Sequence, residues 1–480
     1  MKTYRKILLT VVVLGSWLVS QGQQYPDSLL QYLEIAAKNN PAVLQKFTEY
    51  QIALQKVPQA GSLSDPELSL GVFLKPMELV SGNQVADIRL MQMFPWFGVL
   101  KNAKDEMSLM ANAKFELFRD AKLQLFYEVQ KTWYELYKIR KDISISEKNI
   151  EILKTIERLA LVRFKSAPLG GAGTTSSGAG MSSGSSQAAI RGNLSGMQSM
   201  GSSQGSTVTA KADQSMSSVA PMGYSANGSG LADLYRIQME AGELENSIAL
   251  LKNQEQSVTA LFNGYLNRRP DSPVFTDEIL SADSLGLSLI AVSDSMLINN
   301  PMLSMIELEK QSIDARKKMV SSMGYPMVGL GLDYSIINKS QMSESSMNGT
   351  DMIMPMVSVT LPIYRKKYNA MKNEAELLKT AASQNYEASV NALQTEYYNA
   401  VQMFRDAGRR MELYGNQFRL ASQSFDLMLK SFSTSSSGLT DVLRVRQQML
   451  EYEFMQVEAV ADYNTAIAWL NRLMANSQIQ

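Results

Sequence analysis

The sequence lacks cysteine and histidine altogether, and this absence removes several kinds of chemistry at once. Without Cys there are no disulfides, thiolate nucleophiles or thiolate metal sites, and without His there is no imidazole base or imidazole metal ligand. Neither sign of charge is in excess, because Lys plus Arg and Asp plus Glu both number 46. We therefore expect that the protein binds no nucleic acid, is not an enzyme and holds no cofactor.

Long hydrophobic runs are also scarce. Three basic residues, the last of them Lys6, precede an apolar run over 7–19, and small residues follow at Ser20 and Gly22. This run is too short to span a bilayer of roughly 30 Å, and the small residues occupy the positions that a signal peptidase reads. We predict a signal peptide over 1–22. No later stretch approaches about 18 consecutive apolar residues, so we expect an exported chain without a transmembrane helix.

The sequence contains an internal duplication. Two landmarks each occur twice and in the same order: Asn39-Asn40-Pro41 with Asn299-Asn300-Pro301, and Gly230-Leu231-Ala232-Asp233 with Gly438-Leu439-Thr440-Asp441. Between the landmarks, each copy shows the pattern of a short helix, two strands and two very long helices. Because a duplication governs the whole fold, we divide the mature chain into a first repeat over 23–270 and a second over 271–480.

Four segments alternate between apolar and polar or small residues with the period of a β-strand. They are 66–75, 84–94, 326–338 and 351–361. Such segments are typical of membrane-spanning barrel strands, although a half-buried strand of a soluble sheet gives the same pattern. Their pairing across polar loops over 78–84 and 338–351 favours the barrel. Pro355 inside the fourth segment predicts a β-bulge, since proline removes a ladder hydrogen bond.

Heptad repeats are the strongest periodic signal. Apolar residues lie seven apart at Val390, Tyr397, Phe404, Met411, Phe418, Phe425 and Phe432. This spacing predicts a coiled coil, and the corresponding segment of the first copy, 100–166, predicts a helix about 100 Å long. Four strands cannot close a membrane barrel, which needs at least about eight, so several copies of the chain must share one barrel.

This order of elements resembles the TolC-type family of outer-membrane efflux factors. The resemblance rests on the duplication, the Asn-Asn-Pro elements, the aromatic-Pro hinge at Phe94-Pro95 and the two helix-tip motifs. It implies a mixed, mainly α fold, with long coiled-coil helical hairpins and four membrane β-strands per chain. It also implies a homotrimer with a twelve-stranded β-barrel in the outer membrane and an α-helical tunnel in the periplasm. The implied partners are outer-membrane lipid, a periplasmic membrane-fusion adaptor and an inner-membrane pump of the RND type.

The resemblance also indicates residues of the periplasmic entrance. An Asp ring near the second helix tip narrows the entrance in that family, and the matching residue here is Asp441, with Asp233 at the equivalent place in the first repeat. A second acid one turn further along is replaced by Arg444, and a basic latch residue is replaced by Ser437, so neither a double ring nor a latch is carried over. Helix capping is the alternative role of both Asp residues.

Methionine is in excess, with 30 occurrences against 29 for glycine. Five lie in the Gly/Ser-rich segment 167–230, which we expect to be a disordered insertion at the first helix tip: Met181, Met197, Met200, Met216 and Met222. Thioether sulfur suits Cu(I) and the similarly soft Ag(I), and it persists in an oxidising compartment. Elsewhere in the chain, methionine is expected as an adaptable filler of helix interfaces.

Five further methionines fall on the polar side of the predicted strands and are therefore expected to face the lumen. They are Met91, Met93, Met352, Met354 and Met356. The sequence favours an exit duct of a tripartite efflux system, with Cu(I) or Ag(I) as cargo. A drug or protein export duct of the same family and a soluble periplasmic coiled-coil scaffold remain open as alternatives.

Overall fold

The computed structural model describes residues 28–79, 81–166, 230–286, 288–342, 346–434 and 438–475. The predicted signal peptide and the five methionines of the tip insertion lie outside these residues. The chain forms two compact units, Met1–Glu151 with Glu243–Gln480, and Ile152–Gly242.

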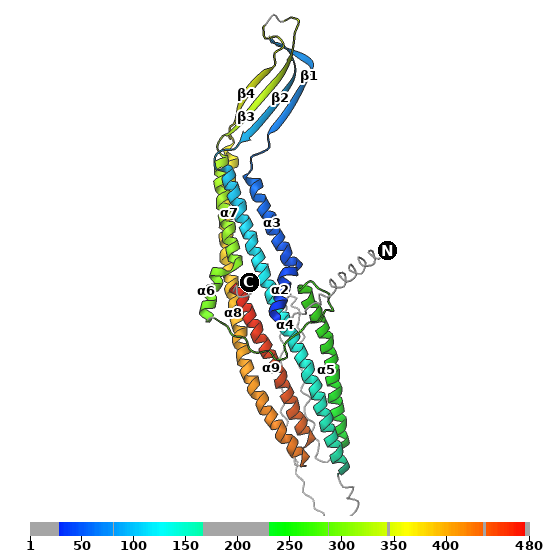
Figure 1. Ribbon diagram of the computed structural model, residues 1–480. Coiled ribbons are helices and arrows are strands. Elements are labelled where there is room, and N and C mark those ends of the chain that lie inside the picture. Colours follow the sequence, from blue (N-terminus) through cyan, green and yellow to red (C-terminus); the bar gives the residue numbers. More distant parts are fainter. Residues whose placement is uncertain are drawn as a thin grey trace, which may run out of the picture. The chain divides into compact units, whose positions relative to one another are not determined.

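The same order of elements occurs twice along the chain (Figure 1). The first repeat contains α2 (Leu29–Asn39), α3 (Pro41–Gly61), β1 (Glu67–Leu79), β2 (Gly82–Phe94), α4 (Val99–Ser166) and α5 (Gly230–Tyr265). The second contains α6 (Leu289–Asn299), α7 (Pro301–Met323), β3 (Met327–Asn338), β4 (Met352–Thr360), α8 (Arg365–Ser433) and α9 (Leu439–Leu473). The predicted fold class, mainly α with long helical hairpins and four strands per chain, is confirmed.

The duplicated asparagines explain why each repeat begins with a broken helix. Asn40 ends α2, and its side-chain Oδ1 accepts hydrogen bonds from the backbone N–H groups of Ala42 and Val43 at 3.0 and 3.2 Å, which caps α3. Proline at the first position of α3 fits because it has no N–H to satisfy there. Asn300 caps α7 in the same way through the N–H of Met302 at 3.0 Å.

The same two asparagines also bind the last helix of their own repeat. Asn40 Nδ2 donates to the carbonyl of Tyr265, the last residue of α5, at 2.9 Å, and Asn300 Nδ2 donates to the carbonyl of Leu473, the last residue of α9, at 3.4 Å. Helix ends leave backbone groups without intrahelical partners. A single side chain therefore satisfies the start of one helix and the end of another, and it joins the two ends of the repeat.

The linker between the repeats is held by side chains of three helices. The hydroxyl of Tyr32 on α2 accepts from the N–H of Phe275 at 2.9 Å, and the hydroxyl of Tyr137 on α4 accepts from the N–H of Leu280 at 3.1 Å. Asn464 on α9 accepts from the N–H of Asp283 at 2.8 Å. These bonds replace the regular secondary structure that this segment lacks.

Among the described residues of the larger unit, two hydrophobic clusters contribute to its core. The first joins α2, α3, α4, α5 and α9 around Tyr32, Leu136 and Phe262, all with no exposed surface. The second joins α6, α7, α8 and α9 and includes the heptad residue Tyr397, as well as Ala400. The coiled-coil pattern of α8 therefore corresponds to its packing along α9 and α7.

One helical stretch of the described residues, Leu289–Met323, is long and apolar enough to cross a membrane by length and composition alone. It consists of α6 and α7 and is interrupted at Asn300. Its apolar residues Val292, Met296 and Leu303 are buried in the second cluster. Only 33% of the apolar window is buried, and Ile290 and Ile298 are 78% and 75% exposed, so these contacts account for part of the hydrophobicity.

The four strands form one antiparallel sheet in the order β1-β2-β3-β4. β1 and β2 are longer than the sequence predicts, because β1 continues to Leu79 and β2 begins at Gly82, so most of 78–84 is strand rather than loop. The expected bulge at Pro355 is wrong. β4 pairs with β3 in an unbroken register through Leu332 and Pro355, so the proline does not shift this pairing.

The smaller unit, Ile152–Gly242, contains the end of α4 and the beginning of α5. Leu153, Ile156 and Ile237 are almost fully buried within it. Gln238 Nε2 donates to Glu157 Oε1 at 3.0 Å, which joins the two helices.

We predict that Asn40→Ala lowers the free energy of unfolding by about 1–3 kcal/mol, because it removes an N-cap and leaves a helix carbonyl without its donor. Thermal unfolding of the purified protein measures the effect. Asn39→Ala is the matched control, since Asn39 is exposed and is the last residue of α2. Equal destabilisation by both substitutions would contradict the assigned role.

Candidate functional site

The sheet has one apolar face and one polar face. The residues of the apolar face occupy matching positions on all four strands: Leu68, Leu70 and Val72 on β1, Ile88 and Leu90 on β2, Leu330 and Leu332 on β3, and Ile353, Val357 and Val359 on β4. Most are exposed, with Leu70 at 68% and Val357 at 72%. A continuous exposed apolar surface of this kind requires a nonpolar environment or a partner.

The polar face carries charged, hydroxyl and thioether side chains in cross-strand rows. One row contains Ser69, Arg89, Asp333 and Met354, and the next contains Glu67, Met91, Gly331 and Met356. Arg89 Nε and Asp333 Oδ2 form an ion pair at 3.0 Å, with the Asp333 side chain only 6% exposed. The five strand methionines all lie on this face, as the alternation in the sequence predicts.

Three of these methionines gather over two glycines of β3. Met91 and Met93 come from β2 and Met356 comes from β4, while Gly331 and Gly329 lie on the strand between them. The hydroxyl Oγ of Ser358 lies 3.8 Å from the sulfurs of both Met91 and Met93. A Cβ atom added to Gly331 would lie 3.6 Å from the terminal methyl groups of both Met91 and Met356.

The other two strand methionines lie apart from this group. Met354 is opposite Asp333 and Met352 is opposite Ser335, and they are 48% and 46% exposed. The structure therefore divides the predicted lumen methionines into a cluster of three and two separate residues. We call Met91, Met93 and Met356 the methionine cluster.

Oxygen and nitrogen ligands are not arranged for a metal in the part of the chain that the structure describes. No group of three or more Asp or Glu residues there could hold an ion. The thioethers of Met91 and Met356 approach each other from different strands. Their chemistry suits soft monovalent cations and not Zn²⁺, Mg²⁺ or Ca²⁺.

The predicted entrance residues Asp441 and Arg444 lie in the first turns of α9. Arg444 Nη2 and Asp441 Oδ1 form an exposed ion pair at 3.2 Å. The N-cap position is Gly438, which has no side chain, so capping by the Asp441 side chain stays a prediction. Asp441 places its charge in the first helical turn, where the helix dipole favours an acid.

The equivalent residue of the first repeat, Asp233, lies in the first turn of α5. Its side chain is outside the described part of the structure, as are Ser437 and the methionines Met181, Met197, Met200, Met216 and Met222. The roles predicted for these residues therefore rest on the sequence.

The structure also contains buried polar side chains between α4 and α9, which we call the polar seam. This seam is not predicted from the sequence. Arg446 on α9 is 2% exposed, and its Nε donates to Oδ1 of Asn149 on α4 at 2.6 Å. Its guanidinium group also lies 5.5 Å from the ring centroid of Phe425. The seam could have been noticed because a charged residue occurs at Arg446 between the apolar positions Leu443 and Leu450.

Asp142 lies in the same seam. Its Oδ1 atom is buried and finds no hydrogen-bond partner among the described residues, and neither does Oγ of Ser146 one turn further along α4. Burial raises the pKa of Asp142 to about 7, although nearby Lys138 opposes the shift and Glu458 adds to it. Lys138 and Glu458 themselves form an ion pair at 2.8 Å. The seam is therefore sensitive to pH near neutrality.

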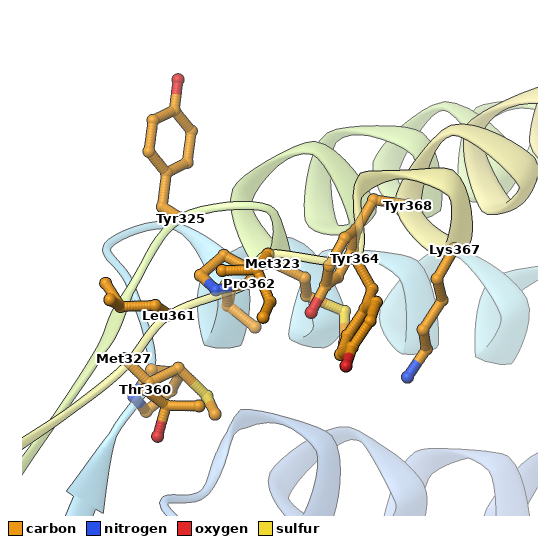
Figure 2. Close-up of a pocket in the computed structure, with 12 residues that line it drawn as sticks. Met323, Tyr325, Met327, Thr360, Leu361, Pro362, Tyr364, Lys367 and Tyr368 are labelled. Atoms are coloured by element: carbon orange, nitrogen blue, oxygen red, sulfur yellow. The ribbon is translucent and has the colours of Figure 1, made fainter.

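A pocket of about 360 Å³ lies where the strands meet the long helices (Figure 2). Its lining includes Pro362, Tyr364 and Lys367 at the junction of β4 and α8. Tyr325 points away from the labelled residues in Figure 2 and stacks on Trp96, with ring centroids 5.3 Å apart. Aromatic residues with a polar tip are common where a membrane barrel meets water.

The duplicated helical hairpins and the two-faced sheet define the fold of the TolC-type outer-membrane channels. The chain superimposes on the open-state MtrE outer-membrane channel of Neisseria gonorrhoeae with a TM-score of 0.66 and 14% identity, covering 94% of this chain and 89% of that one. The outer-membrane protein VceC of Vibrio cholerae gives 0.66 and 12%, covering 93% and 96%, and CusC gives 0.66 and 12%, covering 94% and 95%. No protein-family model and no curated protein sequence matches the chain.

We predict that the stability of the protein falls as the pH rises from about 4 to about 7, because folded Asp142 retains its proton over this interval whereas the unfolded residue loses it. Asp142→Asn should remove this loss. The variant should unfold at a temperature close to the wild type at pH 4 and at a higher temperature at pH 8, by an amount equivalent to about 1–3 kcal/mol.

The measurement is thermal unfolding in detergent across this pH range. Asp105→Asn is the control, because Asp105 is an exposed residue of the same helix. If the unfolding temperatures of the wild type and Asp142→Asn changed with pH in the same way, Asp142 would not be the cause of the pH dependence.

Proposed function

We propose that the protein is the exit duct of a tripartite efflux system, a passive channel that carries cargo from the periplasm to the exterior. The observation that carries the proposal is the exposed apolar face that runs across all four strands of the sheet. Together with the fold similarity over 94% of the chain, this surface supports insertion into the outer membrane. The signal peptide predicted over 1–22 supports export.

The two outer strands of the sheet support a shared barrel. β1 and β4 are its edges within the described chain, and an edge with free N–H and C=O groups is not stable in lipid. Pairing β4 of one copy with β1 of the next satisfies both edges. Three copies give the twelve-stranded barrel implied by the family resemblance, and the helical hairpins then form the periplasmic tunnel.

The proposed partners act at the tunnel entrance. A periplasmic membrane-fusion adaptor would bind near the helix tips and connect the duct to an inner-membrane pump of the RND type. The protein would perform no catalysis. Asp441, Asp233 and Arg444 are proposed as entrance residues that set the local charge.

The proposed cargo is Cu(I) or Ag(I). Support comes from the excess of methionine, from the five tip methionines and from the methionine cluster on the polar face. Drugs or a secreted protein are the alternative cargo within the same class. A deletion strain tested against copper, silver, zinc, cobalt and several antibiotics distinguishes these possibilities.

A soluble periplasmic coiled-coil scaffold is the alternative of another class. It explains the long helices, but it leaves side chains such as Leu70 and Val357 exposed to water across the whole sheet. A scaffold would remain in solution after detergent is removed.

We predict that the protein requires detergent and forms a closed ring of three chains. Ser69 on β1 and Met354 on β4 lie in one row with two strands between them, about 14 Å apart. A linker shorter than this distance cannot join the two positions within one chain. In the variant with Ser69→Cys and Met354→Cys, a short bis-maleimide linker should therefore join neighbouring copies.

The native chain has no cysteine, so the reaction is specific for the introduced pair. Denaturing gels should show linked species up to the trimer and none larger, because a ring of three uses all its edges. Each single variant is a control and should give no trimer. A detergent-free soluble monomer would reject the barrel, and a ladder beyond three would reject the closed ring.

We predict that the charges of Asp441 and Arg444 oppose each other at the entrance. Arg444→Gln leaves an uncompensated negative charge on each chain and should increase cation preference in single-channel recordings, whereas Asp441→Asn should decrease it. The double variant should resemble the wild type. The exposed ion pair of Asp406 and Arg409 on α8 has the same i,i+3 spacing, so Arg409→Gln is a matched control.

The measured quantity is the reversal potential in a salt gradient. If Arg444→Gln and Arg409→Gln shift it equally, the effect is one of net charge and the entrance role of Asp441 is rejected.

A further inference from the structure

The methionine cluster brings together thioether side chains from two strands that do not pair with each other. Met91 on β2 and Met356 on β4 are both opposite Gly331 of β3. Because glycine has no side chain, the two thioethers can extend over it from either side. Their terminal methyl groups each lie 3.6 Å from the point where a Cβ of residue 331 would be, so they are within about twice that distance of each other.

Met93 joins the cluster through the neighbouring glycine. A Cβ atom on Gly329 would lie 2.6 Å from the sulfur of Met93 and closer still to Oγ of Ser358, so a larger residue at 329 would displace both groups. Oγ of Ser358 lies 3.8 Å from the sulfurs of Met91 and Met93. Gly329 is therefore a condition for the positions of Met93 and Ser358, whereas a Cβ on Gly331 would be in ordinary contact with the methyl groups of Met91 and Met356.

Packing alone does not account well for this arrangement. An apolar filler over glycine could be leucine, isoleucine or valine, and β-branched residues are preferred in strands. The cluster instead lies on the polar face, one row from the ion pair of Arg89 and Asp333. Thioethers are neutral, soft donors, and they are flexible enough to adjust to an ion.

We propose that Met91, Met93 and Met356 form a binding site for one soft monovalent cation, Cu(I) or Ag(I), on each chain. This inference rests on the proposed function in one respect: the polar face lines a lumen only if the protein is the duct. The three sulfurs are neutral, and Glu67 is the acid opposite Met91 in the same cross-strand row. Conduction requires that such a site also release its cation.

Ag(I) binding to the purified protein tests the site. The chain has no thiol or imidazole, so thioethers are the soft ligands available to the ion. Dilute peroxide oxidises methionine to the sulfoxide, and a cation on the sulfur lone pair prevents this reaction. Peptide mass spectrometry measures the oxidation of each methionine separately, so the remaining methionines do not obscure the result.

We expect Ag(I), but not K⁺, to slow the oxidation of all three cluster residues with one common half-saturating concentration. Met352 and Met354 are internal controls on the same face and strand as Met356, and they should be protected much less. In Met91→Leu, the concentration that protects Met93 and Met356 should rise by about tenfold or more, because a donor is lost while apolar bulk is kept. Met352→Leu should leave that concentration unchanged.

Equal protection of Met352 and Met354 would overturn the site, and so would unchanged protection of Met93 and Met356 in Met91→Leu. Thermal unfolding verifies the folding of Met91→Leu and Met352→Leu. If Ag(I) gives no protection although the cross-linked trimer forms, only the metal site is rejected. If the trimer does not form, the proposal of an exit duct is rejected, and the protection by Ag(I) still tests the metal site.

Discussion

The hydrogen bonds of Asn40 and Asn300 are the interactions on which the rest of each repeat depends. One amide side chain stops a short helix, starts the next and holds the carbonyl end of the last helix of the repeat. This fixes where α3 and α7 point, and hence where the strands that follow them begin. The positions of the sheet, its two faces and its rows of side chains therefore depend on the change of direction at Asn40 and Asn300.

Much of the fold could be predicted because its signals are local and periodic. The alternation of Val328, Leu330 and Leu332 identifies a strand, and the seven-residue spacing of Tyr397 and Phe404 identifies a helix packed along one side. The ends of elements were harder to predict. Lys75 and Pro76 interrupt the alternation at an irregularity in the pairing of β1 with β2, so the sequence gives no sign that β1 continues to Leu79.

The errors and omissions concern contacts between distant residues. Pro355 predicts a bulge from the sequence, but the pairing of β4 with β3 passes through it without a shift. The alternation places five methionines on one face, but only the register across β3 shows that three of them meet over Gly329 and Gly331. Asp142 and Arg446 are separated by hundreds of residues, and a heptad pattern cannot reveal that α4 and α9 meet there.

The core of the first repeat has a consequence for how the chain reaches its native state. Ala461 and Ala468 of α9, the last helix, belong to the same cluster as Tyr32 of α2, the first described helix. Contacts across such a sequence separation form late and slowly. A chain that emerges from a translocation pore with its N-terminus first would therefore leave part of this apolar surface uncovered until nearly the whole sequence has emerged, and would depend on a holding chaperone during that interval.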